Sequence, residues 1–320
     1  MPKTKSHADH ALADPAPFDA SVTLAGLKLK NPILTASGTF GYGEEFAPFG
    51  DLASLGGIVV KGVSLERRRG NPLPRIAETP SGMLNAIGLQ NSGAKHFLNL
   101  SLPKLPWKDT PIIVNLYAQS SQEFTDLTAT LARAEGIAAF EINISCPNVN
   151  CGGMIFGQSP EAAAEVTAAV KKAAAGKPVL VKLSPNVTDI AAVAKAAEEA
   201  GADALSCINT LTGMAVDIHT RKPRLANIIG GLSGPAIKPV ALRCVWQVAQ
   251  AVRIPVIGIG GILTAEDVLE FILVGAAAVQ IGTANFLRPD TAFKLVKETE
   301  KLARELGLAN WAELRGTLRV

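Results

Sequence analysis

The amino-acid sequence predicts an α/β protein that folds as a single (β/α)8 barrel of the TIM type, and three observations support this prediction. Eight short runs of β-branched and apolar residues alternate with helical stretches along the 320-residue chain, as expected for parallel strands buried on both faces. Hydrophobic residues make up 48% of the chain and charged residues 18%, so most of the chain is buried. A doubly wound open sheet, the competing architecture, would carry a G-x-G-x-x-G turn after its first strand, and this turn is absent there.

The predicted barrel begins after a short hairpin. Residues 21–30 alternate polar and apolar side chains around Ala25-Gly26, which predicts two antiparallel strands joined by a tight turn. A long insertion, residues 65–110, separates the second barrel strand from the third, and insertions of this size usually serve a binding or catalytic site. The predicted barrel strands are residues 32–38, 57–64, 111–118, 139–146, 178–185, 204–211, 255–262 and 278–284.

The helices predicted between the later strands have recognisable ends. Residues 159–160 (Ser-Pro) and 188–189 (Thr-Asp) are typical of helix starts, and Thr264 stands three residues before Asp267, as in a capping box. Glycines in the left-handed conformation commonly follow the last turn of a helix. The glycines predicted to end helices in this way are Gly176, Gly201 and Gly275.

The composition excludes several classes of protein. Residues 1–17 are polar and lack the apolar core of a secretory signal, so we expect a disordered tail there and the barrel in residues 18–320. No apolar stretch approaches the roughly 18 residues needed to cross a bilayer, and the 4 cysteines have neither disulfide-scaffold nor metal-site spacing. The net charge is only +3, and the single basic run, residues 67–69, is typical of a solvated loop. We expect a cytoplasmic protein that holds no metal and binds neither nucleic acid nor a membrane.

Polar side chains gather at the predicted carboxyl ends of the barrel strands, where the active sites of such barrels lie. Lysines and amides follow otherwise apolar strands there, and burying them without partners would cost several kcal/mol. A ligand would supply those partners, although any single one of these residues could instead pair with a neighbouring loop. The strand-end residues are Ser37, Lys61, Asn115, Asn143, Cys146, Lys182, Asn209, Thr210, Gly260, Gly261, Gly282 and Thr283.

Three features of these strand ends indicate the kind of ligand. Gly260-Gly261 and Gly282-Thr283 follow the last two strands, where barrels commonly bind a phosphate through backbone N–H groups. Lys182 has two chemical interpretations, a Schiff-base nucleophile or a fixed cation that stabilises negative charge on a cofactor. Cys146 ends the fourth strand before a glycine-rich segment, residues 151–157, which is typical of a lid over a reactive thiol.

Two strings of residues carry a family resemblance. Residues 143–148 (NISCPN) and residues 85–91 (NAIGLQN) resemble the dihydroorotate dehydrogenases, and the likeness spans nearly the whole chain beyond residue 18. Cysteine rather than serine at position 146 is similar to the soluble class 1 enzymes, and the continuation GGMIFG at residues 152–157 resembles the class 1B catalytic subunit. The resemblance implies a barrel that binds FMN.

The resemblance also implies two sets of binding residues. Around FMN it places Ser37, Lys61, Gly62, Asn115, Asn143, Lys182, Ile208, Gly234, Gly260, Gly261, Gly282 and Thr283. Around orotate or dihydroorotate it places Lys61, Asn85, Ala86, Ile87, Gly88, Leu89, Asn143, Asn209 and Thr210. The chemistry is consistent with these roles, because a lysine such as Lys182 favours a reduced, negatively charged flavin, and asparagine amides match the donor and acceptor edge of a pyrimidine.

The mechanism and partners follow from the same resemblance. Cys146 would remove a proton from C5 of dihydroorotate while the C6 hydride passes to the flavin, which gives orotate for pyrimidine biosynthesis. The sequence shows neither a dinucleotide fingerprint after a strand nor iron-sulfur spacing, so the electrons must leave for an external acceptor. The resemblance implies a homodimer of barrels within a heterotetramer, whose second subunit carries FAD and a [2Fe-2S] cluster and reduces NAD⁺. A class 1A enzyme that reduces fumarate, a Schiff-base lyase centred on Lys182 and a catalytically silent scaffold barrel are the alternatives.

Overall fold

The computed structural model describes residues 18–144 and 156–320, and a parallel eight-stranded sheet forms its centre. Around the sheet each strand neighbours the strands that precede and follow it in the chain. The two edge strands of this sheet, residues 33–35 and 58–63, are joined by a parallel bridge between Leu34 and Gly57, with Gly56 N donating to Ile33 O at 2.9 Å. The sheet is therefore closed as predicted, and the doubly wound alternative, whose order would reverse part-way, is excluded. The strands are β3 (Ile33–Thr35), β4 (Ile58–Val63), β7 (Ile112–Leu116), β8 (Ala139–Asn143), β9 (Val179–Lys182), β10 (Ala204–Cys207), β15 (Val256–Ile259) and β16 (Ala278–Ile281).

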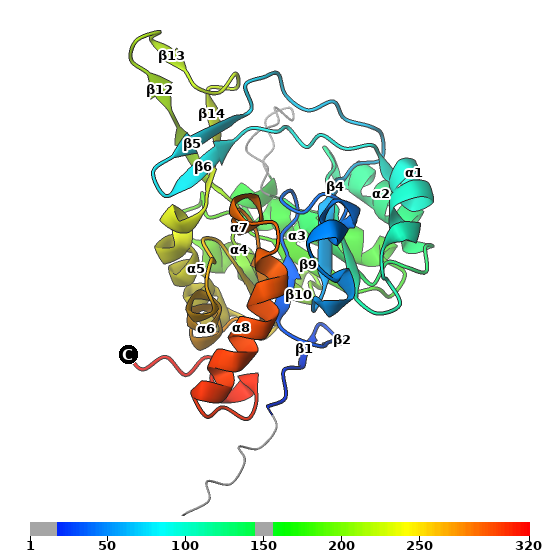
Figure 1. Cartoon of the computed structure of the whole chain (residues 1–320). Helices are drawn as coiled ribbons and strands as arrows, with labels where there is room; N and C mark the ends of the chain where they lie inside the picture. The colour runs from blue at the N-terminus through cyan, green and yellow to red at the C-terminus, as the bar shows by residue number, and fades with distance from the viewer. Residues whose placement is uncertain (1–17, 145–155) are drawn as a thin grey trace, which may run out of the picture.

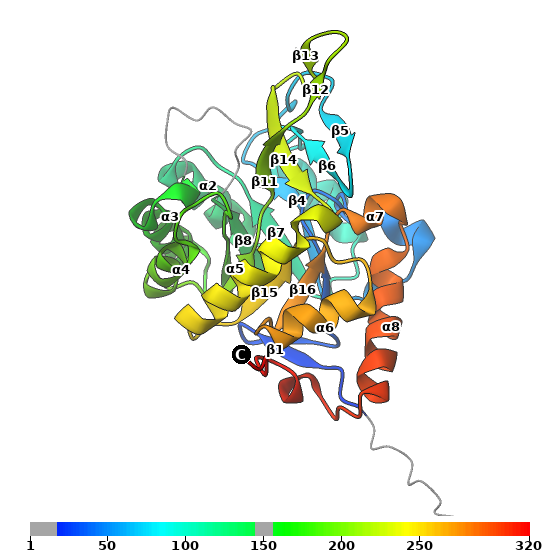
Figure 2. The ribbon, with the colours of Figure 1, turned by 90° about the vertical axis from the view of Figure 1, so that its left-hand side faces the viewer.

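Helices surround this barrel (Figures 1 and 2). Their ends confirm the predicted capping: the Ser159 hydroxyl accepts from Ala162 N, and Thr264 and Asp267 form a complete capping box. At residues 188–189 the cap is Asp189, whose carboxylate accepts from two backbone N–H groups of the first turn. Two 3-10 turns, Glu44–Phe49 and Leu52–Ser54, follow β3 in place of an α-helix. The α-helices are α1 (Ala94–His96), α2 (Ser121–Ala132), α3 (Pro160–Ala173), α4 (Ile190–Glu199), α5 (Lys238–Ala251), α6 (Ala265–Leu273), α7 (Ala284–Leu287) and α8 (Thr291–Glu305).

The predicted hairpin closes the amino-terminal end of the barrel. β1 (Val22–Leu24) and β2 (Leu27–Leu29) pair in antiparallel register, and Ala25 and Gly26 both adopt positive φ in the turn. Leu24 and Leu29 pack against the lowest row of side chains inside the barrel. That row is entirely apolar, so side chains fill the amino-terminal end of the barrel and leave no opening there. Its members are Leu34, Val59, Ile113, Ala139, Leu180, Ala204, Ile257 and Ala278.

A second, smaller sheet lies over the opposite end of the barrel (Figures 1 and 2). The long insertion contributes β5 (Ile76–Thr79) and β6 (Gly82–Asn85), two strands that were not predicted from the sequence. The segment after β10 contributes β11 (Leu211–Met214) and β14 (Ile229–Ser233), in the order β11-β14-β6-β5. A short hairpin, β12 (Val216–Asp217) and β13 (Lys222–Pro223), extends from it. None of the described helices has the length and apolarity to span a bilayer.

Candidate active site

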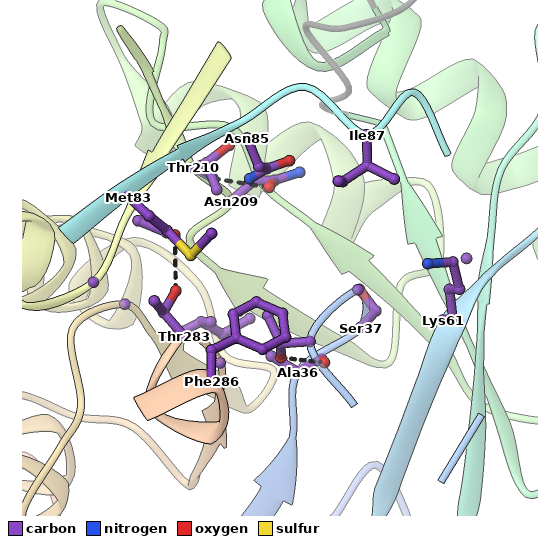
Figure 3. Close-up of a pocket in the computed structure, with 18 of the residues that line it drawn as sticks. Ala36, Ser37, Lys61, Met83, Asn85, Ile87, Asn209, Thr210, Thr283 and Phe286 are labelled. Atoms are coloured by element: carbon purple, nitrogen blue, oxygen red, sulfur yellow. Dashed lines mark hydrogen bonds between the residues drawn. The ribbon is translucent and has the colours of Figure 1, made fainter. Parts of the chain in front are cut away.

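A pocket of about 480 Å³ lies between the carboxyl ends of the barrel strands and the smaller sheet (Figure 3). Every residue predicted to hold the cofactor lines this pocket, although these residues come from widely separated segments of the chain. The predicted substrate residues line it as well, with the exception of Ala86, which is 1% exposed and packs with Leu84 and Leu225 on the face of the smaller sheet that is turned away from the pocket. Cys146 and residues 151–155 of the predicted lid lie outside the described residues.

Two lysines supply positive charge to the pocket from the barrel side. Lys182, at the end of β9, is 5% exposed, and its Nζ donates to Ser37 Oγ at 3.4 Å. Lys61, on β4, is half-buried. Burial lowers the pKa of Lys61 from its usual value, while the nearby Glu45 carboxylate acts in the opposite direction and Arg75 lowers it further. The pocket is therefore suited to an anionic ligand.

Amide side chains line the upper part of the pocket, where Figure 3 shows Asn85, Asn209 and Thr210 close together. Asn209 Nδ2 donates to Asn143 Oδ1 at 3.3 Å, and Asn209 Oδ1 accepts from Thr210 N at 2.8 Å. Asn85 Nδ2 lies 3.4 Å from Gly231 O. The smaller sheet thus joins the barrel strands in presenting both donors and acceptors to one ligand edge, as recognition of a polar heterocycle requires.

Glycine backbone forms the wall of the pocket beyond β15. Gly260 and Gly261 have φ of +128° and +79°, in the region that favours glycine. A Cβ on Gly261 would lie 2.6 Å from Lys238 Cβ and 2.9 Å from Lys238 N, so a side chain has no room there. Backbone N–H groups in such a turn bind phosphate readily, since no side chain blocks the approach.

Asp267 holds this glycine turn in place. Its Oδ2 accepts from Leu263 N at 2.7 Å and Thr264 N at 2.9 Å, while its Oδ1 accepts from Lys238 Nζ at 2.5 Å. Burial would raise the pKa of Asp267, but the Lys238 ammonium and the two backbone N–H groups outweigh burial and hold it below its usual value. Asp267 therefore links α5, α6 and the turn between Gly261 and Thr264.

The polar floor of the barrel was not predicted from the sequence. Glu141 on β8 is fully buried and accepts from Asn115 Nδ2 at 2.7 Å, Ser206 Oγ at 2.6 Å and Gln280 Nε2 at 2.6 Å. These four residues stand two positions after the apolar row on their strands, Ala139 preceding Glu141 for example. Because alternate residues of a strand face the same side, the position of these residues two places after the apolar row was the sequence signal that could have identified them.

Other lining residues also escaped sequence reasoning. Met83 and Phe286 reach the pocket from β6 and α7 (Figure 3), and Glu45 comes from the 3-10 turn after β3. The basic run lines an adjoining cavity of about 550 Å³, in which the half-buried Arg68 guanidinium lies 4.9 Å from the centre of the Tyr117 ring. The run is therefore only partly the solvated loop that the sequence predicted.

The pocket contains the groups that FMN requires. It offers glycine backbone for a phosphate, lysines for a flavin that becomes negatively charged, and a buried amide oxygen, Asn115 Oδ1, that has no hydrogen-bond partner among the described residues. No group of three metal-ligating side chains occurs in the described part of the chain. The fold and the site define a TIM-barrel enzyme whose pocket suits a phosphorylated heterocyclic cofactor and a small anionic heterocycle.

Comparison with known proteins identifies the family. The family model for dihydroorotate dehydrogenase matches residues 19–303. Relatives named "Dihydroorotate dehydrogenase B (NAD(+)), catalytic subunit" are 68% identical over 94% of this chain and 99% of the relative in Solidesulfovibrio magneticus, and 64% identical over 95% and 99% in Maridesulfovibrio salexigens. A relative of the same name in Geotalea uraniireducens is 57% identical over 94% of this chain. The chain belongs to the dihydroorotate dehydrogenase family and is an oxidoreductase, which confirms the resemblance seen in the sequence.

Proposed function

We propose that this protein oxidises (S)-dihydroorotate to orotate with FMN as its bound cofactor, in the pyrimidine biosynthesis of the cytoplasm. The observation that carries the proposal is the convergence of Lys61, Lys182 and the asparagine amides on one pocket beside a glycine turn. FMN, when bound, supplies the acceptor for the hydride that leaves C6 of dihydroorotate. The residues that would hold it are Ser37, Lys61, Gly62, Asn115, Asn143, Lys182, Ile208, Gly234, Gly260, Gly261, Gly282 and Thr283.

The chain's own residues bind the substrate and move a proton. Lys61 would hold the substrate carboxylate, and Asn85, Asn143 and Asn209 would hold its ring through matched donors and acceptors. Cys146, whose role rests on sequence alone, would take the C5 proton as a thiolate. Loss of this proton and of the C6 hydride converts the single C5–C6 bond into the double bond of orotate.

The visible spectrum of the purified protein tests this proposal. We expect flavin absorbance that bleaches when dihydroorotate is added without oxygen, and an orotate product in equal amount to the flavin reduced. Cys146→Ser should retain FMN and orotate binding and lose about 10²–10⁴-fold in rate at neutral pH. A colourless protein would contradict the FMN site, and borohydride trapping of a substrate on Lys182 would favour the lyase alternative.

The electron acceptor is a second part of the proposal. We infer a partner subunit that carries FAD and a [2Fe-2S] cluster and passes electrons to NAD⁺, with two copies of each chain in a heterotetramer. The relatives' name, a catalytic subunit linked to NAD(+), supports this inference. The isolated chain should reduce artificial dyes but neither NAD⁺ nor fumarate efficiently, and should gain NAD⁺ activity with the partner. Rapid turnover of the isolated chain with fumarate would instead support the class 1A alternative.

A further inference from the structure

Glu141 controls the orientation of one amide at the base of the pocket. An asparagine amide has a donor end and an acceptor end of nearly equal shape, so its neighbours decide which end points where. The Glu141 carboxylate accepts from Asn115 Nδ2 at 2.7 Å, which places the Asn115 nitrogen toward the barrel axis. Asn115 Oδ1, at the other end of the amide, is buried and has no hydrogen-bond partner among the described residues.

This oxygen lies beside the wall of the pocket. A Cβ on Gly62 would stand 3.0 Å from Asn115 Oδ1, and both Gly62 and Asn115 line the pocket. Because buried amide oxygens nearly always accept a hydrogen bond, an oxygen left open at this position calls for a donor from the ligand. Glu141 keeps Asn115 Oδ1 available for that donor. Its carboxylate accepts from the amide nitrogen and has no donor that would favour the amide turned by 180°.

The depth of Asn115 indicates which ligand supplies that donor. Asn115 is 1% exposed, and its Nδ2 donates to Glu141, which is fully buried and does not line the pocket, so Asn115 lies at the base of the pocket on the barrel side. Asn85 reaches the pocket from the smaller sheet on the far side. Asn115 therefore faces the ring that lies against the barrel, which in the proposed site is the flavin.

We propose that Glu141 is a positioning residue that acts through Asn115, presenting Oδ1 as a fixed acceptor for the N3–H group of the isoalloxazine ring. The inference rests on the proposed FMN site and adds a residue that does not line the pocket itself. N3–H is a hydrogen-bond donor that lies between two carbonyl groups of the flavin. Asn115 Oδ1 can accept from it in the observed orientation of the amide, whereas a turned amide would place the Asn115 NH₂ group, a second donor, opposite N3–H.

The test compares Glu141→Gln, Asn115→Ala and the double variant with Thr128→Val, all as FMN-loaded proteins. Thr128 is buried in α2 and donates to Phe124 O at 2.6 Å, so its substitution controls for the loss of a buried hydrogen bond away from the pocket. The FMN dissociation constant is measured from the fluorescence that FMN recovers on release, and the flavin midpoint potential by equilibration with a reference dye. Orotate affinity is measured from its perturbation of the flavin spectrum.

We expect each single variant to weaken FMN binding about tenfold, which corresponds to about 1.4 kcal/mol. The double variant should be no weaker than Asn115→Ala, because residues that act through one another are non-additive. Glu141→Gln should also raise the midpoint potential, since removing a buried negative charge below the ring favours the reduced, anionic flavin. Thr128→Val should leave both quantities unchanged, whatever it does to the melting temperature.

Several results would overturn the inference. They are wild-type FMN affinity in Glu141→Gln, fully additive losses in the double variant, and a loss confined to orotate affinity, which would assign Asn115 Oδ1 to the substrate. If Glu141→Gln does not fold, Glu141→Asp, which keeps the carboxylate but draws it back from Asn115 Nδ2, tests the role of Glu141 by the same FMN measurement, and wild-type FMN affinity in that variant would overturn the inference. Failure of the wild-type chain to bind FMN would instead refute the proposed function.

Discussion

Asp267→Asn tests whether the glycine turn of the pocket depends on the carboxylate behind it. Asp267 is 8% exposed and accepts from Leu263 N, Thr264 N and Lys238 Nζ. The single oxygen of an asparagine can still accept from the two backbone N–H groups, but its NH₂ group then faces the Lys238 ammonium. Hydrogen bonds to charged groups contribute about 1.5–3 kcal/mol each. Lys238 keeps a second partner, Glu270 Oε2 at 2.8 Å, which places the expected loss near the lower end, at about 2 kcal/mol.

The expected consequences are a lower melting temperature and weaker retention of FMN. At roughly 2–4 °C per kcal/mol for domains of 150–250 residues, the melting temperature of Asp267→Asn should fall by about 4 °C in this longer chain. FMN should also dissociate faster from the variant, because the turn that contains Gly261 loses its link to α5. Asp290→Asn, at the half-buried start of α8, is the matched control, because it removes an ion pair with Lys294 away from the glycine turn and should leave FMN retention unchanged.

The pH dependence gives a second test of the same carboxylate. The folded-state pKa of Asp267 lies below the ordinary aspartate value of 3.8, so its contribution to stability is present above the unfolded pKa and is lost as the pH falls through the folded pKa. Asp267→Asn should therefore lose less stability than the wild type on acidification below pH 3.8. An unchanged melting temperature together with unchanged FMN retention would refute the reasoning.

Three further predictions concern charge, backbone and the amino terminus. Orotate affinity, measured by spectral titration, should fall as the pH rises through the depressed pKa of Lys61. Glu45→Gln removes a carboxylate that raises this pKa, so the variant should lose orotate affinity at a lower pH than the wild type. Identical pH profiles of the two proteins would contradict the role of Lys61. Gly261→Ala should weaken FMN retention, because its Cβ would meet Lys238 Cβ at 2.6 Å, and wild-type release kinetics would count against the glycine turn. Trp311→Phe removes the hydrogen bond from Trp311 Nε1 to Ala20 O at 2.8 Å. In urea titrations the free energy of unfolding should fall by about 1 kcal/mol, while FMN affinity should not change. An unchanged urea midpoint of unfolding would show that the hydrogen bond contributes nothing to stability.

The barrel was predictable because its strands are buried on both faces. Such strands appear as short apolar runs, and β4 (Ile58–Val63) and β7 (Ile112–Leu116) fall within the predicted ranges 57–64 and 111–118. The smaller sheet was not predicted from the sequence. The long insertion was assigned to a site, but β11 and β14 were missed because their burial is partial and Gly213, Gly230 and Gly231 interrupt any strand pattern.

The pocket was predictable to the extent that it consists of strand ends. Parallel strands end at one edge, so Lys61, Asn143 and Lys182 had to meet once the barrel closed. Ala86 is the exception because its side chain turns away from the pocket into an apolar cluster, whereas its neighbours Asn85 and Ile87 line the pocket. Family resemblance transfers a segment as a whole and does not distinguish the side chains that face a ligand from those that face the core.

The alternation of residues along the strands also predicts the polar contacts of Glu141. On β8 the inward-facing residues are Ala139, Glu141 and Asn143. Ala139 belongs to the apolar row, Glu141 is a buried carboxylate and Asn143 lines the pocket. A fully buried carboxylate is tolerated only where donors surround it, so Glu141 implies donors among the inward-facing residues of other strands. Ser206 and Gln280, two positions after Ala204 and Ala278, meet that requirement. Applied to every strand at once, the same alternation predicts the polar floor of the barrel, whereas the orientation of the Asn115 amide follows only from its hydrogen bond to Glu141.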